Sequence, residues 1–403
     1  MDFFDNSCFR FTKIFSCIIG QWPYQTKAEK IIISSIYIFL NSTFISVTII
    51  GLSTLELNFD ELINNVTIII TNVGIMIKLL NCVYNKKKMK DLLNRFKSNW
   101  TMMSDTEIQT LQKFSETGKL VVITYAAVVY SSMCIYLMSS YVPQILDIIK
   151  PLNESRPKRR VYRSNYLVDD DEYFYTLLFH EQFCFILNIT TVICVDALYV
   201  KYVEHVCGIF SILRNRIENI MNIFDLEYSE THTFITDEQI TKQVSLCIAY
   251  HRKAIKCAEC IKSIYGVALF IEVGMNMVLL SATGYVCAVR LGSLNQFIQL
   301  VPFASGQVLH FFFNAVPGQQ LINFSEAIGD SVCNAQWYRM PIKAQKLLIL
   351  VMFRSFRRPC TIHAFGGIFT LSVELFSAGM KASISYFAVL LSVSPTKNKD
   401  TES

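Results

Sequence analysis

The chain has 403 residues, of which 52% are hydrophobic and only 17% carry a charge. A typical soluble domain is about 45–50% apolar with glycine counted and about 25% charged. A soluble core cannot bury this much apolar surface, whereas a lipid bilayer replaces water as its solvent. The net charge of +5 is small and spread over polar connections, which argues against a nucleic-acid partner. The composition therefore predicts an integral membrane protein and excludes a soluble enzyme.

The cysteines predict neither a disulfide framework nor a metal site. Most of the thirteen lie in apolar runs, where Cys behaves as a small apolar residue, and a single loop bridge stays open as an alternative. Cys257 and Cys260 form a C-x-x-C pair with His251 nearby, but nothing completes a set of four zinc ligands. We therefore expect no metal and no cofactor.

Seven apolar stretches are long enough to cross the bilayer, which takes about 20 helical residues. They lie at 31–52, 62–84, 120–145, 173–206, 263–288, 295–316 and 364–392. Residues 1–30 lack a signal-peptide cleavage pattern and are predicted to stay as a cytoplasmic segment. Residues 31–316 form a six-helix bundle, 317–363 form a cytoplasmic region after a helix stop at Pro317-Gly318, and 393–403 form an extracellular tail. The predicted fold class is an all-α membrane protein with seven transmembrane helices.

The flanking charges predict a cytoplasmic N-terminus. Lys27 and Lys30 precede the first span, the run 86–88 of three lysines follows the second, and the loop between these spans has no Lys or Arg. Asn153 begins an N-E-S glycosylation sequon in the loop 147–172, which fits an outside position. G-protein-coupled receptors have the opposite orientation, and the chain lacks their D-R-Y and N-P-x-x-Y motifs.

The last span is the strongest candidate for a functional element. One helical face collects Glu374, Ala378, Lys381, Ser385, Val389 and Ser392. A charged side chain in lipid costs about 2.5–3.5 kcal/mol even on the lenient scale, so this face predicts a pore lining or a bundle interior. The alternatives are a Glu374–Lys381 pair within the helix and small residues that allow close helix packing.

Other charged residues within the spans favour a structural role. Lys78 is placed where it can extend toward the membrane surface. Asp196, Lys201 and Glu272 are predicted to form buried pairs that fix helix register. No Walker loop, dinucleotide fingerprint, nucleophile elbow or H-E-x-x-H motif is present, so the sequence predicts no enzyme.

Aromatic and apolar residues in the outer halves of the spans predict a dry pocket between helices. The candidate lining residues are Met133, Tyr136, Leu137, Phe183 and Ile186. Such a pocket suits a small volatile ligand held by shape and dispersion with few polar anchors. Ordinary helix packing is the alternative for each of these residues.

Several stretches give the chain a family resemblance. They are LNFDELINNVTIIITNVGIMIKLLN at 57–81, KPLNESRP at 150–157, CVDALYVKYVEHVCGIFSILRNRIEN at 194–219, FIEVGMNMVLLSATGY at 270–285 and FNAVPGQQLINFSEAIGDSVCNAQWY at 313–338. The spacing of Pro359, Gly366, Ser372, Phe376 and Ser385-Tyr386 completes the pattern. In this order and combination, the chain resembles an insect odorant receptor of the variable, ligand-binding kind.

The resemblance implies an odorant-binding subunit of a ligand-gated, non-selective cation channel in the plasma membrane of olfactory neurons. It implies a hetero-tetramer with the odorant receptor coreceptor, an anchor between subunits at 317–360, and a split last helix that lines the pore. The apolar gate of the family maps onto Val389, with Ser392 and Val393 just beyond. The short connection between spans four and five suits a ligand-binding subunit, whereas Lys381 is not explained by the family.

Three other classes stay open, among them a G-protein-coupled receptor, which an N-terminus on the outside would favour. A gustatory-type receptor channel is the nearest alternative. A secondary transporter would show inverted repeats and broken helices at the membrane midplane, and no convincing repeat is present.

Overall fold

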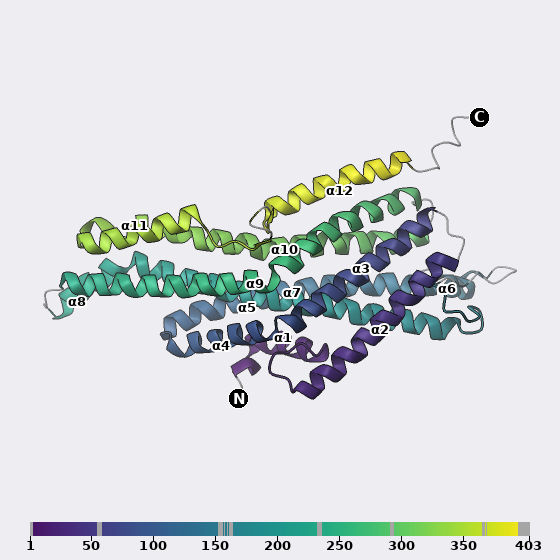
Figure 1. The fold of residues 1–403 in the computed structure, drawn as a ribbon, viewed down its shortest axis with the longest axis horizontal. Coiled ribbons are helices and arrows are strands. Elements are labelled where there is room, and N and C mark those ends of the chain that lie inside the picture. Colours follow the sequence, from purple (N-terminus) through teal and green to yellow (C-terminus); the bar gives the residue numbers. More distant parts are fainter. Residues whose placement is uncertain are drawn as a thin grey trace.

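The computed structural model describes residues 3–54, 59–151, 156, 158, 160, 164–231, 236–290, 294–364, 367 and 369–393. In this part of the chain the fold is all-α, as predicted. The helices are α1 (Ser7–Ile18), α2 (Lys27–Thr54), α3 (Phe59–Tyr84), α4 (Lys86–Met102), α5 (Asp105–Met138), α6 (Val142–Ile149), α7 (Phe174–Glu218), α8 (Ile220–Thr231), α9 (Asp237–Arg290), α10 (Leu294–Asn334), α11 (Ile342–Arg357) and α12 (Val373–Val393). Short 3₁₀ turns lie at Phe3–Asp5, Ser139–Tyr141 and Trp337–Arg339. Figure 1 shows an elongated bundle with α8 and α11 at one end.

Six helices of the described chain are long and apolar enough to cross a membrane. These helical stretches, each of which contains an apolar segment long enough to cross, are Lys27–Thr54, Glu61–Tyr84, Asp105–Ile149, Phe174–Glu218, Asp237–Val289 and Val373–Val393. The predicted span 295–316 falls in α10, which does not meet this test. Polar residues such as Gln307, His310 and Asn314 lower the hydropathy of α10, and they recur on one face of the helix.

α7 is the central helix of the bundle. Every residue from Thr190 to Phe210 is buried, because α5, α9 and α10 pack around this stretch. A helix that is surrounded on all sides carries apolar residues on all faces, as α7 does here. α7 is thus the helix around which α5, α9 and α10 are packed.

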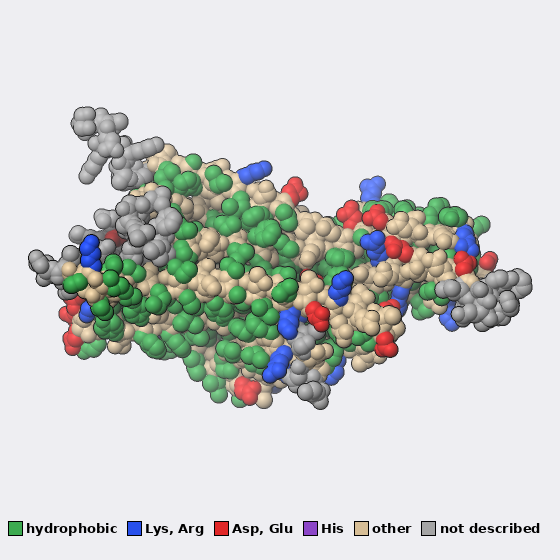
Figure 2. Space-filling view, turned by 180° about the vertical axis from the view of Figure 1, so that it is seen from behind, with side chains coloured by type: hydrophobic (Ala, Val, Ile, Leu, Met, Phe, Trp, Pro, Cys, Tyr) green, Lys and Arg blue, Asp and Glu red, His purple; other side chains and the backbone are tan. Residues whose placement is uncertain are grey.

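The outer surface is apolar over the half of the molecule that lies opposite α8 and α11. Exposed side chains on α2 include Ile31, Ile32 and Phe39. Figure 2 shows hydrophobic side chains over this half, with Lys, Arg, Asp and Glu more frequent over the end that holds α8 and α11. A surface of this kind is stable in a lipid bilayer and not in water, so the helices fit a multi-pass membrane protein.

The predicted helix stop at Pro317-Gly318 is wrong. α10 continues through Pro302 and Pro317 to Asn334. A proline removes one backbone hydrogen bond, and neighbouring helices can support the helix across it. Gly318 serves a different purpose, since a Cβ built there would lie 2.4 Å from the carbonyl oxygen of Leu371. The glycine allows the chain that leads into α12 to pass directly over α10.

The last helix begins later than predicted. The expected helix 364–392 starts instead at Val373, with Ser372 accepting a hydrogen bond from the backbone N–H of Leu375 at 3.2 Å. Before it, the strands β1 (His363–Ala364) and β2 (Phe369–Thr370) pair as an antiparallel hairpin. The backbone N–H of Leu371 also donates to the carbonyl of Ile362 at 2.8 Å. This hairpin separates α11 from α12.

Candidate ligand cavity and pore helix

A cavity of about 140 Å³ lies between α3, α5, α7, α9 and α10. Apolar and aromatic side chains form most of its wall, among them Ile68, Val129, Met133, Tyr136, Phe303 and Leu279. An apolar cavity of about 150 Å³ holds a benzene molecule. The volume therefore suits a small organic ligand.

Aromatic rings line one end of the cavity. The ring of Tyr136 stacks on those of Phe185 and Phe303, with centroid distances of 5.3 and 5.5 Å. Tyr136 and Phe44 belong to a small buried cluster that packs behind this end. Aromatic pairs of this type contribute about 0.5–1.5 kcal/mol beyond the area that they bury, so this end is a packed aromatic surface.

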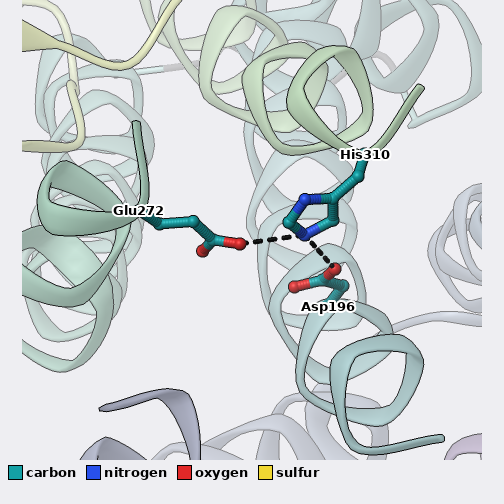
Figure 3. A group of neighbouring side chains, drawn as sticks. All are labelled: Asp196, Glu272 and His310. Atoms are coloured by element: carbon teal, nitrogen blue, oxygen red, sulfur yellow. Dashed lines mark ion pairs between the residues drawn. The ribbon is translucent and has the colours of Figure 1, made fainter. Parts of the chain in front are cut away.

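The opposite end of the cavity is charged. The Lys78 ammonium on α3 lies 2.5 Å from a carboxylate oxygen of Asp196 on α7 and 2.6 Å from one of Glu272 on α9. His310 Nε2 on α10 lies 3.1 Å from Asp196 and 2.8 Å from Glu272. Figure 3 shows the imidazole between the two carboxylates, each of which comes from a different helix. We call these four residues the charged cluster.

The charged cluster confirms the prediction that charged residues of the spans form buried pairs. The partner of Asp196 and Glu272 is Lys78, however, and not the predicted Lys201. Lys78 is 5% exposed and reaches inward to the carboxylates, so the expected extension toward the membrane surface is wrong. Lys201 instead donates to the carbonyl oxygen and hydroxyl of Ser115, both at 2.7 Å. Burying charges is favourable only when they are paired, which is why four helices converge here.

Asp196, Glu272 and His310 also have the geometry of a cation site. One ligand atom from each lies within 4.8 Å of the others. Oxygen and imidazole donors at this spacing are typical metal ligands. The ammonium of Lys78, within 2.6 Å of both carboxylates, fills the position that a metal ion would take. The cluster therefore carries its own internal cation.

Asn188 and Gln307, two of the amide side chains on the cavity wall, differ in how their polar atoms are satisfied. Asn188 donates to Asn72 at 2.6 Å and accepts from Asn41 at 2.9 Å, and it also bonds to the Tyr37 hydroxyl. By contrast, both the nitrogen and the oxygen of the Gln307 amide are buried with no hydrogen-bond partner among the described residues.

The predicted ligand residues divide into two groups. Met133 and Tyr136 line the cavity, since they lie one turn apart on the inward face of α5. Leu137 packs beside Tyr136 but does not line the cavity. Phe183 and Ile186 are 40% and 39% exposed on the outer side of α7, away from the cavity. Their assignment to the ligand site does not fit the structure.

The polar part of the cavity wall was not predicted from the sequence. Gln307 and His310 line it from α10, and Glu272 and Asn276 line it from α9. The signal was present as polar residues at positions 307, 310 and 314, the spacing of one helical face within an apolar stretch.

The predicted pore residues share one exposed face of α12. Glu374, Ala378, Lys381, Ser385, Val389, Ser392 and Val393 are all exposed. The opposite face packs on α9 and α10 through Gly379 and Ser383, the two buried residues of the helix. The polar stripe thus has no covering element among the described residues of one chain, as Figure 1 also shows for the position of α12 at the edge of the bundle.

Two contacts fix the buried face of α12. The Ser281 hydroxyl on α9 donates to the carbonyl of Ser383 at 3.1 Å, and the Ser383 hydroxyl lies 3.3 Å from the carbonyl of Met277. A Cβ built on Gly379 would lie 2.7 Å from the ring of Phe311 on α10. Glycine is therefore needed for α12 to approach the bundle this closely.

Arg160, which precedes α7 in the chain, forms two ion pairs. Arg160 bonds to Asp170 at 2.6 Å and to Glu181 at 2.9 Å. Asn153, the predicted glycosylation site, lies outside the described residues.

Comparisons with known proteins agree with the predicted resemblance. The family model described as 7tm Odorant receptor matches residues 58–384. Putative odorant receptor 85d of Drosophila melanogaster is 28% identical over 144 residues, which cover 36% of this chain and 34% of that protein. The chain thus matches about a third of that relative. Odorant receptor 13a of the same species is 20% identical over 340 residues, covering 80% of this chain and 78% of the relative.

The fold agrees with a solved structure. The insect olfactory receptor OR5 from Machilis hrabei, in complex with eugenol, superposes with a TM-score of 0.76. The match covers 96% of this chain and 97% of that chain at 14% sequence identity. The family model spans most of the sequence, so the chain belongs to the 7tm odorant receptor family.

Proposed function

We propose that this chain is the odorant-binding subunit of a ligand-gated, non-selective cation channel. A small organic ligand occupies the cavity between α3, α5, α7, α9 and α10. The exposed face of α12 lines a pore that forms when further subunits, among them the odorant receptor coreceptor, complete a tetramer in the plasma membrane of olfactory neurons. The family membership and the eugenol complex of the OR5 structure support this proposal.

The observation that carries the proposal is that α9 and α10 are shared between the cavity and α12. On α10, His310 lines the cavity while the next residue, Phe311, packs on Gly379. On α9, Met275 lines the cavity and Met277 contacts Ser383. A ligand that shifts either helix therefore acts directly on the packing of the pore helix.

The test is a recording of currents from cells that express the full chain together with a coreceptor, under a panel of small volatiles. We expect ligand-evoked cation currents whose relative permeabilities change in Val389→Ser and Ser392→Val, since both side chains face the proposed pore. Phe39→Leu on the lipid-facing surface of α2 is the control and leaves permeation unchanged. Unaltered permeation in both α12 variants, with normal surface expression, would contradict the pore assignment.

A further inference from the structure

We infer that the cavity selects a small neutral molecule with an apolar body and one hydroxyl head, an alcohol or a phenol, and that Gln307 holds the hydroxyl. This inference rests on the proposed function and names the chemical class of its ligand. It departs from a site that works through shape and dispersion alone.

The polarity of the cavity wall changes in one direction along three of its helices. Each contributes an apolar or aromatic residue at one end and a charged or ionisable one at the other. The pairs are Ile68 and Lys78 on α3, Leu279 and Glu272 on α9, and Phe303 and His310 on α10. A ligand with one polar end matches this gradient in a single orientation.

Gln307 stands at the boundary between the two ends. It lies four residues after Phe303 of the aromatic end and three residues before His310 of the charged cluster, so all three side chains share one face of α10. Its amide nitrogen and oxygen are buried and have no partner among the described residues. Asn72 and Asn188, which also line the cavity, bond to each other instead.

A buried amide without partners is costly, and buried polar groups are nearly always satisfied. The Gln307 amide offers one acceptor oxygen and a donor N–H₂ group. A hydroxyl matches it because it donates one hydrogen and accepts another. The Oε2 atom of Glu272, also on the cavity wall, is a second buried acceptor without a donor among the described residues. The available groups therefore favour a ligand head that can donate.

The charged cluster argues for a neutral head. Lys78 is already paired with the carboxylates of Asp196 and Glu272, so a ligand carboxylate would have to compete with both of them for this cation. A ligand ammonium meets Lys78, which already occupies the position between the two acids, and would face like charge. The cavity of about 140 Å³ limits the body to about the size of one benzene ring.

The experiment compares benzyl alcohol with toluene, which differ by one hydroxyl. The full chain is expressed with a coreceptor, and the half-maximal concentration for current is measured for both probes. Ligand-induced thermal stabilisation of the purified complex gives a second readout. We expect benzyl alcohol to act at a concentration about tenfold lower or more, because a site built for a hydroxyl rejects the analogue that lacks it.

Gln307→Met keeps the length of the side chain and removes the amide. We expect the ratio between the two probes to fall toward one in this variant, mainly through weaker binding of the alcohol. The matched control is Met133→Leu at the apolar end of the wall, which shifts both probes alike and keeps their ratio. The ratio is taken within one variant, so differences in expression cancel.

Three outcomes overturn the inference. Equal potency of the two probes on the unaltered chain would mean that water satisfies Gln307. An unchanged ratio in Gln307→Met would assign the preference to another group. Silence toward both probes, while other volatiles evoke currents, would exclude this ligand class and leave the proposed function standing. A chain that reaches the surface but responds to no volatile would defeat the proposed function itself.

Discussion

Lys78 balances two buried carboxylates, and this balance predicts how the charged cluster responds to mutation. Lys78→Met leaves Asp196 and Glu272 with only His310 of the charged cluster as a partner. Removing one member of a buried ion pair costs about 3–5 kcal/mol, so we expect a large loss of thermal stability and surface expression. Adding Glu272→Gln to this variant restores part of the loss, because one unbalanced charge is removed with the cation. The exposed Lys113, changed to Met in parallel, is the control and shows little effect.

A second ion pair, between Arg216 and Glu107, predicts that the stability of the folded chain depends on pH. Arg216 near the end of α7 donates to both oxygens of Glu107 at 2.5 and 2.9 Å. Glu107 lies in the first turn of α5, outside the apolar stretch 120–145 that is predicted to cross the membrane. Burial raises the pKa of Glu107, but hydrogen bonds from Arg216 and from the backbone of Ser104 outweigh this and lower it below its ordinary value. The carboxylate is therefore better stabilised in the folded chain than in the unfolded one.

The sign of the pH effect follows from this lowered pKa. The stabilisation is fully present above the ordinary carboxyl pKa and is lost as the pH falls through the lower, folded value. Because Glu107 is partly exposed, we expect only about 1 kcal/mol. Thermal unfolding of the purified chain should show this loss below about pH 4.5, and Glu107→Gln should remove it. A Glu107→Gln variant with the same acid dependence as the unaltered chain would assign the effect to other carboxyls.

Single residues also show where sequence-based prediction stops. Met133 and Tyr136 line the cavity, as expected, because their spacing places them on one face of α5. Phe183 and Ile186 have the same chemistry, yet they point outward from α7. Periodicity identifies a face but not the neighbour that the face meets, and lipid and protein attract the same apolar side chains. The sequence could not single out Gln307 for a similar reason, since only the tertiary structure shows that its buried amide has no partner among the described residues.

At the scale of elements, the packing of α12 on α9 and α10 depends on Gly379. Gly379→Ala brings a methyl group 2.7 Å from the ring of Phe311, so the helix or the ring must move. Overpacking of this kind typically costs about 1–3 kcal/mol. We expect lower thermal stability and a changed dose response for every ligand, measured on the same complex. Gly274→Ala on α9 is the matched control, because a Cβ there meets nothing within 4 Å.

The elements divide into those that local sequence determines and those that it does not. Apolar runs located α2, α3, α5, α7 and α9, because the length of a run depends only on neighbouring residues. The continuation of α10 past Pro317 and the hairpin before α12 depend on distant contacts, such as Gly318 against Leu371. The predicted span 295–316 lies within α10, which is not apolar enough to count among the six candidate membrane-crossing helices because its polar face turns toward the cavity.

At the scale of the whole molecule, seven spans and the flanking lysines predict that the two termini lie on opposite sides of the membrane. An epitope tag after Ser403 should bind antibody on intact cells, and a tag before Met1 should bind only after permeabilisation. The paired tags control for expression, since both are carried by the same polypeptide. Labelling of both tags, or of the N-terminal tag alone, on intact cells would contradict this orientation and reopen the G-protein-coupled receptor alternative.

In the proposed channel, ligand affinity and channel opening are linked thermodynamically, because α9 and α10 each contact the cavity and α12. In that channel, a change that favours the open arrangement of α12 raises the equilibrium affinity of the cavity for its activating ligand, and the ligand in turn favours opening. A variant outside the cavity wall, such as one at Gly379, is thus expected to alter the sensitivity of the proposed channel without contacting the ligand. Sensitivity in such a chain is a property of two sites at once, and selection on either one changes the other.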